Sequence, residues 1–115
     1  MACIKANSYY LPEKIVTNEE LVIDFPDWTV EKIATKVGVN QRHVASEDET
    51  ATDLAVKAGE KLFAANPEIK REDIDFVLLC TQSPDYLLPT SACLAQDRLG
   101  LRTNIGALDY NLGCS

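Results

Sequence analysis

The sequence predicts an α/β fold in a single domain over residues 1–115, and two observations carry that prediction. Residues 74–80 and 104–110 are apolar runs of strand length that follow helix-like segments. The segments before and between them have helical spacing and end signals. Because strands that alternate with helices are typical of layered folds with a parallel sheet, we expect helices packed on a sheet. A length of 115 residues suits one domain.

The chain is expected to open with a strand over residues 2–10, which ends at the turn signal Leu11-Pro12. A short helix should follow, because Thr17 and Glu20 have the spacing of a capping box. Pro26 is expected to end that helix, since proline lacks the amide proton that a helix interior requires.

A second helix is predicted from apolar residues at positions i, i+3, i+4 and i+7, with Gly38 as its C-terminal cap. These residues are Val30, Ile33, Ala34 and Val37. Residues 40–46 suggest irregular or short extended structure, and residues 46–50 an acidic surface loop.

A third helix should begin at Thr50 or Thr52 and end at Asn66-Pro67. Its apolar stripe, which we expect to pack close to a sheet, consists of Ala51, Ala55, Ala58, Leu62 and Ala65. Residues 74–80 are apolar on both faces, as in a central parallel strand that helices cover on each side.

A loop over residues 81–88 leads to Pro89, which suits the first turn of a further helix that stops at Gly100. The residues of that helix expected to point inward are Ala92, Ala95 and Leu99. A last strand over residues 104–110 runs into Cys114.

The composition argues against several classes of function. A formal net charge of −7 disfavours nucleic-acid binding, which requires a cationic surface. The longest apolar run, residues 76–80, is far shorter than a membrane span. No basic and apolar leader follows Met1, so we expect a cytoplasmic protein without a signal peptide. The local basic residues that an anionic partner could contact are Lys32, Lys36, Arg42, Arg98 and Arg102.

The four cysteines are spaced too widely for a metal clamp, and His43 is the only histidine. We therefore expect neither a metal site nor disulfides. Cys3, Cys80 and Cys93 lie in apolar contexts and are interpreted as small buried hydrophobic residues.

Cys114 is the candidate nucleophile, because it comes just after a predicted strand, where ligands bind in open α/β sheets. If a helix starts after it, the helix dipole would favour the thiolate, which is the reactive form. The alternative from position alone is a buried structural cysteine.

Four segments together resemble β-ketoacyl-acyl-carrier-protein synthase III, in that family's order and spacing. They are residues 8–21, 36–45, 80–93 and 106–115, and their most specific parts are Leu11-Pro12, Gly38-Val39 with Arg42-His43, Pro89-Thr90-Ser91-Ala92-Cys93, and Asp109 with Cys114. The resemblance implies the N-terminal half of a thiolase-like fold, with a mixed sheet covered by helices, that is incomplete at residue 115. It also implies that Cys114 is the acyl-accepting nucleophile.

In the mechanism that the resemblance implies, Cys114 takes an acyl group from acyl-coenzyme A, and malonyl-acyl-carrier-protein then decarboxylates and attacks the thioester. The assisting His and Asn belong to the other half of the fold, and His43 does not match that histidine. Coenzyme A enters only as a thioester substrate, with no further cofactor. Leu88 matches a residue that reaches across a homodimer to cap the partner's acyl pocket; the alternative is an ordinary hydrophobic loop residue. Lys36 matches a basic position near the coenzyme A nucleotide; the alternative is a solvated lysine.

One position departs from the family pattern. Many members have a Trp that stacks on adenine where this chain has Lys32, whereas Trp28 lies one helical turn earlier and is interpreted as a packing anchor. One alternative keeps the fold and the nucleophile but changes the substrate, as in a condensing enzyme of the 3-hydroxy-3-methylglutaryl-coenzyme A synthase or secondary-metabolite type. A non-catalytic association domain is an alternative of another class. Alone, the 115 residues are expected to be inactive and to associate through incompletely covered strands.

Overall fold

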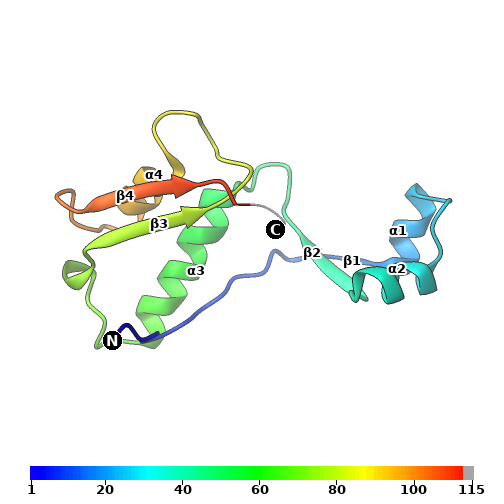
Figure 1. The fold of residues 1–115 in the computed structure, drawn as a ribbon, viewed down its shortest axis with the longest axis horizontal. Helices are drawn as coiled ribbons and strands as arrows, with labels where there is room; N and C mark the ends of the chain where they lie inside the picture. The colour runs from blue at the N-terminus through cyan, green and yellow to red at the C-terminus, as the bar shows by residue number, and fades with distance from the viewer. Residues whose placement is uncertain (113–115) are drawn as a thin grey trace. The chain divides into compact units, whose positions relative to one another are not determined.

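The computed structural model describes residues 1–112, which form two compact units (Figure 1). Leu11–Asp48 is one unit, and Met1–Tyr10 together with the chain from Glu49 onward is the other. The prediction that residues 1–115 form a single domain stays a prediction. Cys114, the candidate nucleophile, lies outside the described residues.

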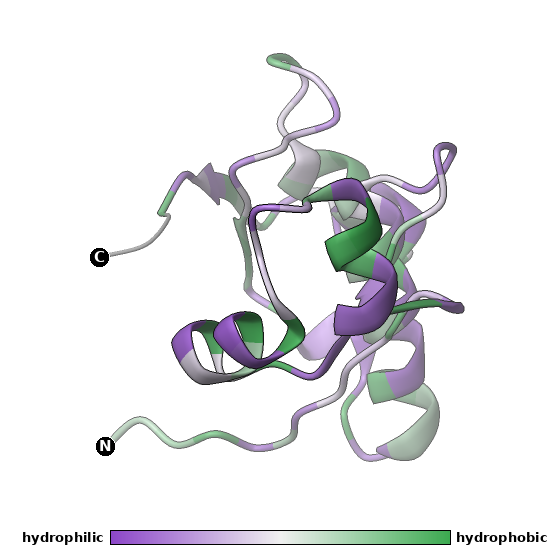
Figure 2. Ribbon diagram, turned by 90° about the vertical axis from the view of Figure 1, so that its right-hand side faces the viewer, coloured by the Kyte–Doolittle hydropathy of each residue, from purple (hydrophilic) through white to green (hydrophobic). Residues whose placement is uncertain are grey.

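The unit over Leu11–Asp48 is a two-stranded antiparallel ribbon with two short helices. Strand β1 (Lys14–Thr17) pairs with β2 (Gln41–Val44), so that Lys14 lies opposite Val44. Helices α1 (Asn18–Asp24) and α2 (Val30–Val37) connect them, and both carry hydrophobic and hydrophilic residues (Figure 2). Ile33 of α2 is buried at 4% exposure and forms the centre of this small core.

The end signals of these helices are confirmed. Thr17 and Glu20 form a reciprocal capping box at the start of α1, and Pro26 follows the C-cap of α1, Phe25. Gly38 caps α2 with a φ of 72°, a left-handed conformation that glycine adopts without steric cost.

The second unit contains a strand–helix–strand arrangement. Strand β3 (Phe76–Cys80) runs parallel to β4 (Gly106–Tyr110), and helix α4 (Ser91–Arg98) connects them and contacts both (Figure 1). The long helix α3 (Ala51–Ala65) packs against α4, and a 3₁₀ turn, η1 (Arg71–Asp73), precedes β3. The predicted parallel pair and both helices are confirmed, with narrower bounds.

The buried side of α3 differs from the predicted alanine stripe. Thr52 and Val56 are its buried residues, whereas the stripe residues are half-buried or, at Ala65, exposed. The C-cap of α4, Leu99, packs against α3 at Gly59, one helical turn after Val56. A Cβ added at Gly59 would lie only 3.0 Å from the Leu99 side chain. The face that is buried is thus set by where α4 docks.

Three further predictions are wrong for the described residues. Residues 2–10 form no strand, because none of the described strands pairs with them. Cys3, Cys80 and Cys93 are exposed rather than buried. Pro89 lies before the helix rather than in its first turn, because Thr90 is the N-cap of α4.

The incomplete cover expected for the strands is observed. Within the described residues only one face of the strands is covered, since α4 packs on the side of Val77 and Leu79.

Candidate functional site

Hydrogen bonds connect the carboxyl end of β4, the N-termini of α3 and α4, and the loop over residues 81–90. In open α/β sheets ligands bind at the carboxyl ends of parallel strands, which makes this edge the candidate site. A hollow at the edge is lined by Thr81, Pro84, Tyr86, Leu87, Thr90, Asp109, Tyr110 and Asn111.

Asp109, near the end of β4, caps helix α4. One of its carboxylate oxygens accepts a hydrogen bond from the backbone N–H of Ser91 at 2.7 Å, and the other accepts from Ala92 at 2.6 Å. Both partner residues are fully buried. Because the first N–H groups of a helix have no partner within the helix, and its N-terminus favours negative charge, the Asp109 carboxylate supplies what α4 lacks. The chain leading to Cys114 is thereby fixed to α4.

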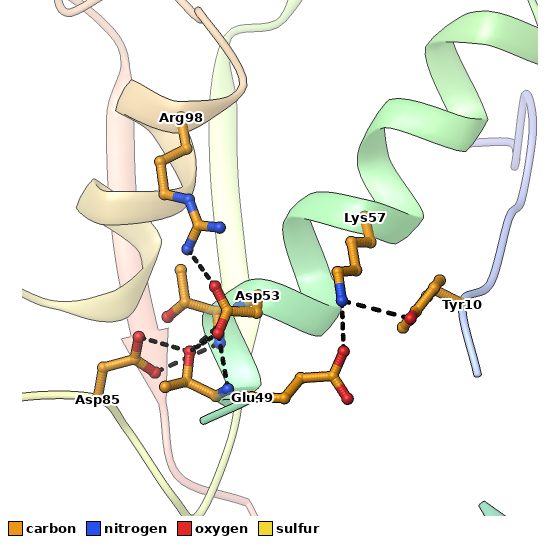
Figure 3. Close-up of polar contacts among 8 residues, drawn as sticks. Tyr10, Glu49, Asp53, Lys57, Asp85 and Arg98 are labelled. Carbon is orange, nitrogen blue, oxygen red and sulfur yellow. Dashed lines mark hydrogen bonds and ion pairs between the residues drawn. The ribbon is translucent and has the colours of Figure 1, made fainter. Parts of the chain in front are cut away.

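Asp85 attaches the loop to helix α3. Its carboxylate accepts a hydrogen bond from the Thr50 hydroxyl at 2.9 Å and from the backbone N–H of Thr52 at 3.3 Å (Figure 3). Its own backbone N–H donates to the hydroxyl of buried Ser91 at 3.2 Å. The loop is therefore attached to α3 and α4 through one residue.

Asp53 completes the cap of α3. The backbone N–H of Thr50 donates to its carboxylate at 2.8 Å, and Arg98 of α4 lies 2.8 Å from the same carboxylate (Figure 3). The hydrogen bond from the Thr50 backbone, and secondly that from Arg98, hold the pKa of Asp53 below its usual value. This ion pair joins the two helices beside the loop.

Lys57 fixes the N-terminal segment to α3. Its ammonium group lies 2.5 Å from the Glu49 carboxylate, donates to the Tyr10 hydroxyl at 3.3 Å, and lies 4.6 Å from the Tyr10 ring centroid (Figure 3). The hydrogen bond to Glu49, more than that to Tyr10, raises the pKa of Lys57. This cluster holds Tyr10 in place, although residues 1–10 form no strand.

Cys80 and Tyr110 lie opposite each other at the ends of β3 and β4. A hydrogen bond with Cys80 raises the pKa of the Tyr110 hydroxyl, and the Cys80 thiol lies 3.6 Å from the carbonyl oxygen of Leu112. Both groups are exposed, on the sheet face opposite α4.

The residues predicted from the sequence are placed as follows. Leu88 is 83% exposed and the neighbouring Leu87 is 92% exposed, so the tip of the loop is apolar and uncovered within the described residues. Lys36 is exposed on the last turn of α2, in the other unit. The roles predicted for Leu88, Lys36 and Cys114 stay predictions.

The basic residues considered as contacts for an anionic partner are mostly engaged within the chain. Arg98 pairs with Asp53, Arg102 pairs with Asp75 at 2.8 Å, and Arg42 donates to the Asn18 side chain at 2.6 Å. Lys32 lies with its ammonium group 4.6 Å from the ring centroid of Trp28.

The unit over Leu11–Asp48 has its own apolar groove, lined by Leu21, Phe25, Trp28, Ile33, Val37 and Arg42. Trp28 lies just before the N-cap of α2 and is 39% exposed. His43 is held by a 2.5 Å contact between its Nδ1 and the carbonyl oxygen of Pro12.

Among residues 1–112, no cluster of three or more His, Cys, Asp or Glu side chains has the geometry to hold a metal ion. None of the helices described is long and apolar enough to cross a membrane.

Sequence reasoning missed the roles of Asp85 and Asp109. Asp109 was recognised only as part of a motif with Cys114, and Asp85 only as a loop residue. The available signal was an acidic residue near the end of a strand and another in the loop before a helix, both of which suit helix N-termini. Which helix each one caps depends on contacts 17 to 35 residues apart in the chain.

Comparisons with known proteins define the class of this fold. A solved structure of a 3-oxoacyl-(acyl-carrier-protein) synthase III matches 97% of the chain, with a TM-score of 0.86 and 52% identity. The matched part is 33% of that structure. The corresponding enzyme of Thermus thermophilus matches 98% of the chain with a TM-score of 0.85 and 38% identity, over 34% of its length. The fold is thus the thiolase-like fold of condensing enzymes.

The particular relatives are β-ketoacyl-acyl-carrier-protein synthases III. Those of Xylella fastidiosa and of a Sulfurovum species are 40% and 39% identical over 99% of the chain. The chain spans about a third of the length of these curated relatives, 34% and 33% respectively. No protein-family model matches. The resemblance that the sequence motifs indicated is confirmed.

Proposed function

We propose that this chain is part of a condensing acyltransferase that loads an acyl group onto Cys114 and joins it to malonyl-acyl-carrier-protein. The observation that carries the proposal is the similarity to β-ketoacyl-acyl-carrier-protein synthases III over 99% of the chain. The product would be a 3-oxoacyl-acyl-carrier-protein, formed at the start of fatty-acid synthesis.

The first step is transfer to the cysteine. The Cys114 thiolate attacks the thioester carbonyl of acyl-coenzyme A, a carbon–sulfur bond forms, and the coenzyme A thiolate leaves. Asp109 supports this step indirectly, because its two hydrogen bonds to α4 fix the chain five residues before the nucleophile.

The second step is condensation. Malonyl-acyl-carrier-protein loses carbon dioxide, and the resulting carbanion attacks the acyl-cysteine thioester, which releases the Cys114 thiolate. The His and Asn that assist this step in the mechanism implied by the resemblance have no counterpart assigned in this chain. No cofactor is required beyond the coenzyme A thioester that is consumed as substrate.

The proposed partners follow from the same reaction. Acyl-coenzyme A and acyl carrier protein would be bound, with Lys36 contributing near the nucleotide, and no nucleic acid or membrane would be involved. The exposed tip at Leu88 supports a homodimer in which this residue caps the partner's acyl pocket. The compartment proposed is the cytoplasm.

Labelling of the full-length protein with an acyl-coenzyme A donor tests the proposal. Mass spectrometry should detect one acyl adduct on the peptide containing Cys114, and Cys114→Ala should abolish the adduct and the condensation while the circular dichroism spectrum stays unchanged. Cys93→Ala is the matched control, because Cys93 is an exposed cysteine on α4 that the proposed reaction does not use. An adduct of normal yield in Cys114→Ala would refute the assignment, and a protein that forms no adduct would favour a non-catalytic association domain.

A further inference from the structure

Between its two ends, the loop over residues 81–90 is held at one point, Asp85. From Gln82 to Pro89 every residue is exposed except Asp85, which is half-buried. Its neighbours on the tip, Tyr86 and Leu87, are 62% and 92% exposed, and Leu88 is 83% exposed. The loop thus presents an apolar tip that has no covering of its own within the described residues.

Asp85 contacts two helices, one through its side chain and the other through its backbone N–H. Its carboxylate bonds to the first turn of α3 through Thr50 and Thr52. Its backbone N–H bonds to Ser91 at the start of α4. The other side-chain bonds of the loop lie at its ends: the Ser83 N–H donates to the Thr81 hydroxyl at 3.0 Å, and the Thr90 hydroxyl lies 3.2 Å from the Cys93 thiol. The Thr81 N–H also donates to the carbonyl oxygen of Tyr110 at 3.2 Å, which attaches the start of the loop to the end of β4.

The anchor is continuous with the cap of α4. Ser91, which accepts from Asp85, also donates its backbone N–H to Asp109 on β4. Ser91 is fully buried and Thr52 is 1% exposed, so water has little access to these two partners of Asp85, whereas its bond to the Thr50 hydroxyl is exposed. A continuous hydrogen-bonded path therefore runs from Asp109 near the end of β4 through Ser91 to Asp85, the residue before the loop tip.

We infer that Asp85 is a positioning residue that holds the Tyr86–Leu88 tip in a fixed place relative to the end of β4, and that it thereby sets which acyl chains the enzyme accepts. The second half of this inference rests on the proposed function. Carboxylate bonds to a helix N-terminus suit such an anchor, because the helix dipole and the unpaired N–H groups both favour a negative charge there.

The test compares Asp85→Ala and Asp85→Asn with Asp97→Ala in the full-length protein. Asp97→Ala removes the same charge from an exposed residue of α4 whose side chain forms no hydrogen bond or ion pair within residues 1–112. Asp85→Asn keeps one acceptor oxygen and serves as the milder variant if Asp85→Ala does not fold.

Hydrogen–deuterium exchange of the peptide over residues 82–88 measures the anchor without any substrate. Loss of two hydrogen bonds to a charged acceptor should accelerate exchange there by at least about tenfold in Asp85→Ala, less in Asp85→Asn, and not in Asp97→Ala. Unchanged exchange in Asp85→Ala would overturn the inference.

The acyl-chain profile measures the consequence. Leu88→Phe should change the ratio of kcat/KM between short and longer donors in the wild-type background, and should change it several-fold less in the Asp85→Ala background, because residue 88 is then no longer held in place. Equal effects in both backgrounds would overturn the specificity half of the inference. If the wild-type protein transfers no acyl group, the proposed function and the specificity half both fail, while exchange still decides whether Asp85 anchors the loop.

Discussion

Removal of the Asp109 carboxylate should destabilise the protein far more than removal of an exposed aspartate. Asp109→Ala leaves the N–H groups of Ser91 and Ala92 without their acceptors, at 2.7 and 2.6 Å in the intact protein. Both residues are fully buried, so water cannot easily replace the lost bonds. At about 1–3 kcal/mol for each of the two unsatisfied buried groups, we expect a loss of roughly 2–6 kcal/mol.

The matched control is Asp75→Ala. Asp75 also forms a 2.8 Å contact, with Arg102, but its side chain is 90% exposed. An ion pair of this kind contributes about 0–1 kcal/mol, because solvent screens it. The destabilisation in Asp109→Asn should lie between those in Asp109→Ala and Asp75→Ala, since the amide oxygen can still accept one hydrogen bond.

Urea unfolding of the full-length variants, followed by far-ultraviolet circular dichroism, measures these differences. The expected order of destabilisation is Asp109→Ala, then Asp109→Asn, then Asp75→Ala. If Asp109→Ala and Asp75→Ala agree within about 0.5 kcal/mol, which is the usual range for surface substitutions, the carboxylate does not cap α4 as described.

Three further predictions concern the loop, the cap of α3 and the sheet. Leu88→Phe should shift the preference of the full-length enzyme toward shorter acyl donors, by about 1–3 kcal/mol for each methylene that is excluded, and an unchanged kcat/KM profile across donor lengths would contradict it. The pKa of Asp53 is lowered from 3.8 chiefly by the hydrogen bond from the Thr50 backbone, so its stabilising effect is complete above that value and is lost as the pH falls below it. Asp53→Asn should therefore make the decline in unfolding free energy below about pH 4 shallower in acid titrations, and an equally steep decline would argue against the cap. The isolated 115-residue chain should associate in size-exclusion chromatography and catalyse no condensation, and Leu78→Lys, on the exposed sheet face, should reduce the association; an active monomer would refute this.

Local signals in the sequence predicted the helix ends well. Thr17, Thr50 and Gly38 cap their helices as expected, because capping depends on residues within three or four positions of each other. The strand expected over residues 2–10 was wrong for a complementary reason. A strand is defined by its partner, and no described strand pairs with this segment.

The sequence predicted where the candidate site lies, but not the contacts that form it. The order of strands and helices indicated the carboxyl edge of the parallel pair, and the motif ending at Cys114 indicated the chemistry. The links that organise the edge join Asp85 to Thr50 and Asp109 to Ala92, and such pairings arise only when the chain folds. One sequence shows which residue types suit a helix N-terminus, but not which helix they will reach.

The two faces of the sheet formed by β3 and β4 differ in whether a helix covers them. Apolar residues on both faces predicted helices on both sides, and within the described residues only the face toward α4 is covered. On the other face Phe76, Leu78, Leu108 and Tyr110 are between 44% and 62% exposed, and the Phe76 ring lies over Gly106, where a Cβ would clash at 2.2 Å. A continuous apolar face of this kind is costly in water. Parallel sheets usually have both faces covered, and this chain spans only about a third of the length of its relatives, so the uncovered apolar face is consistent with the comparison.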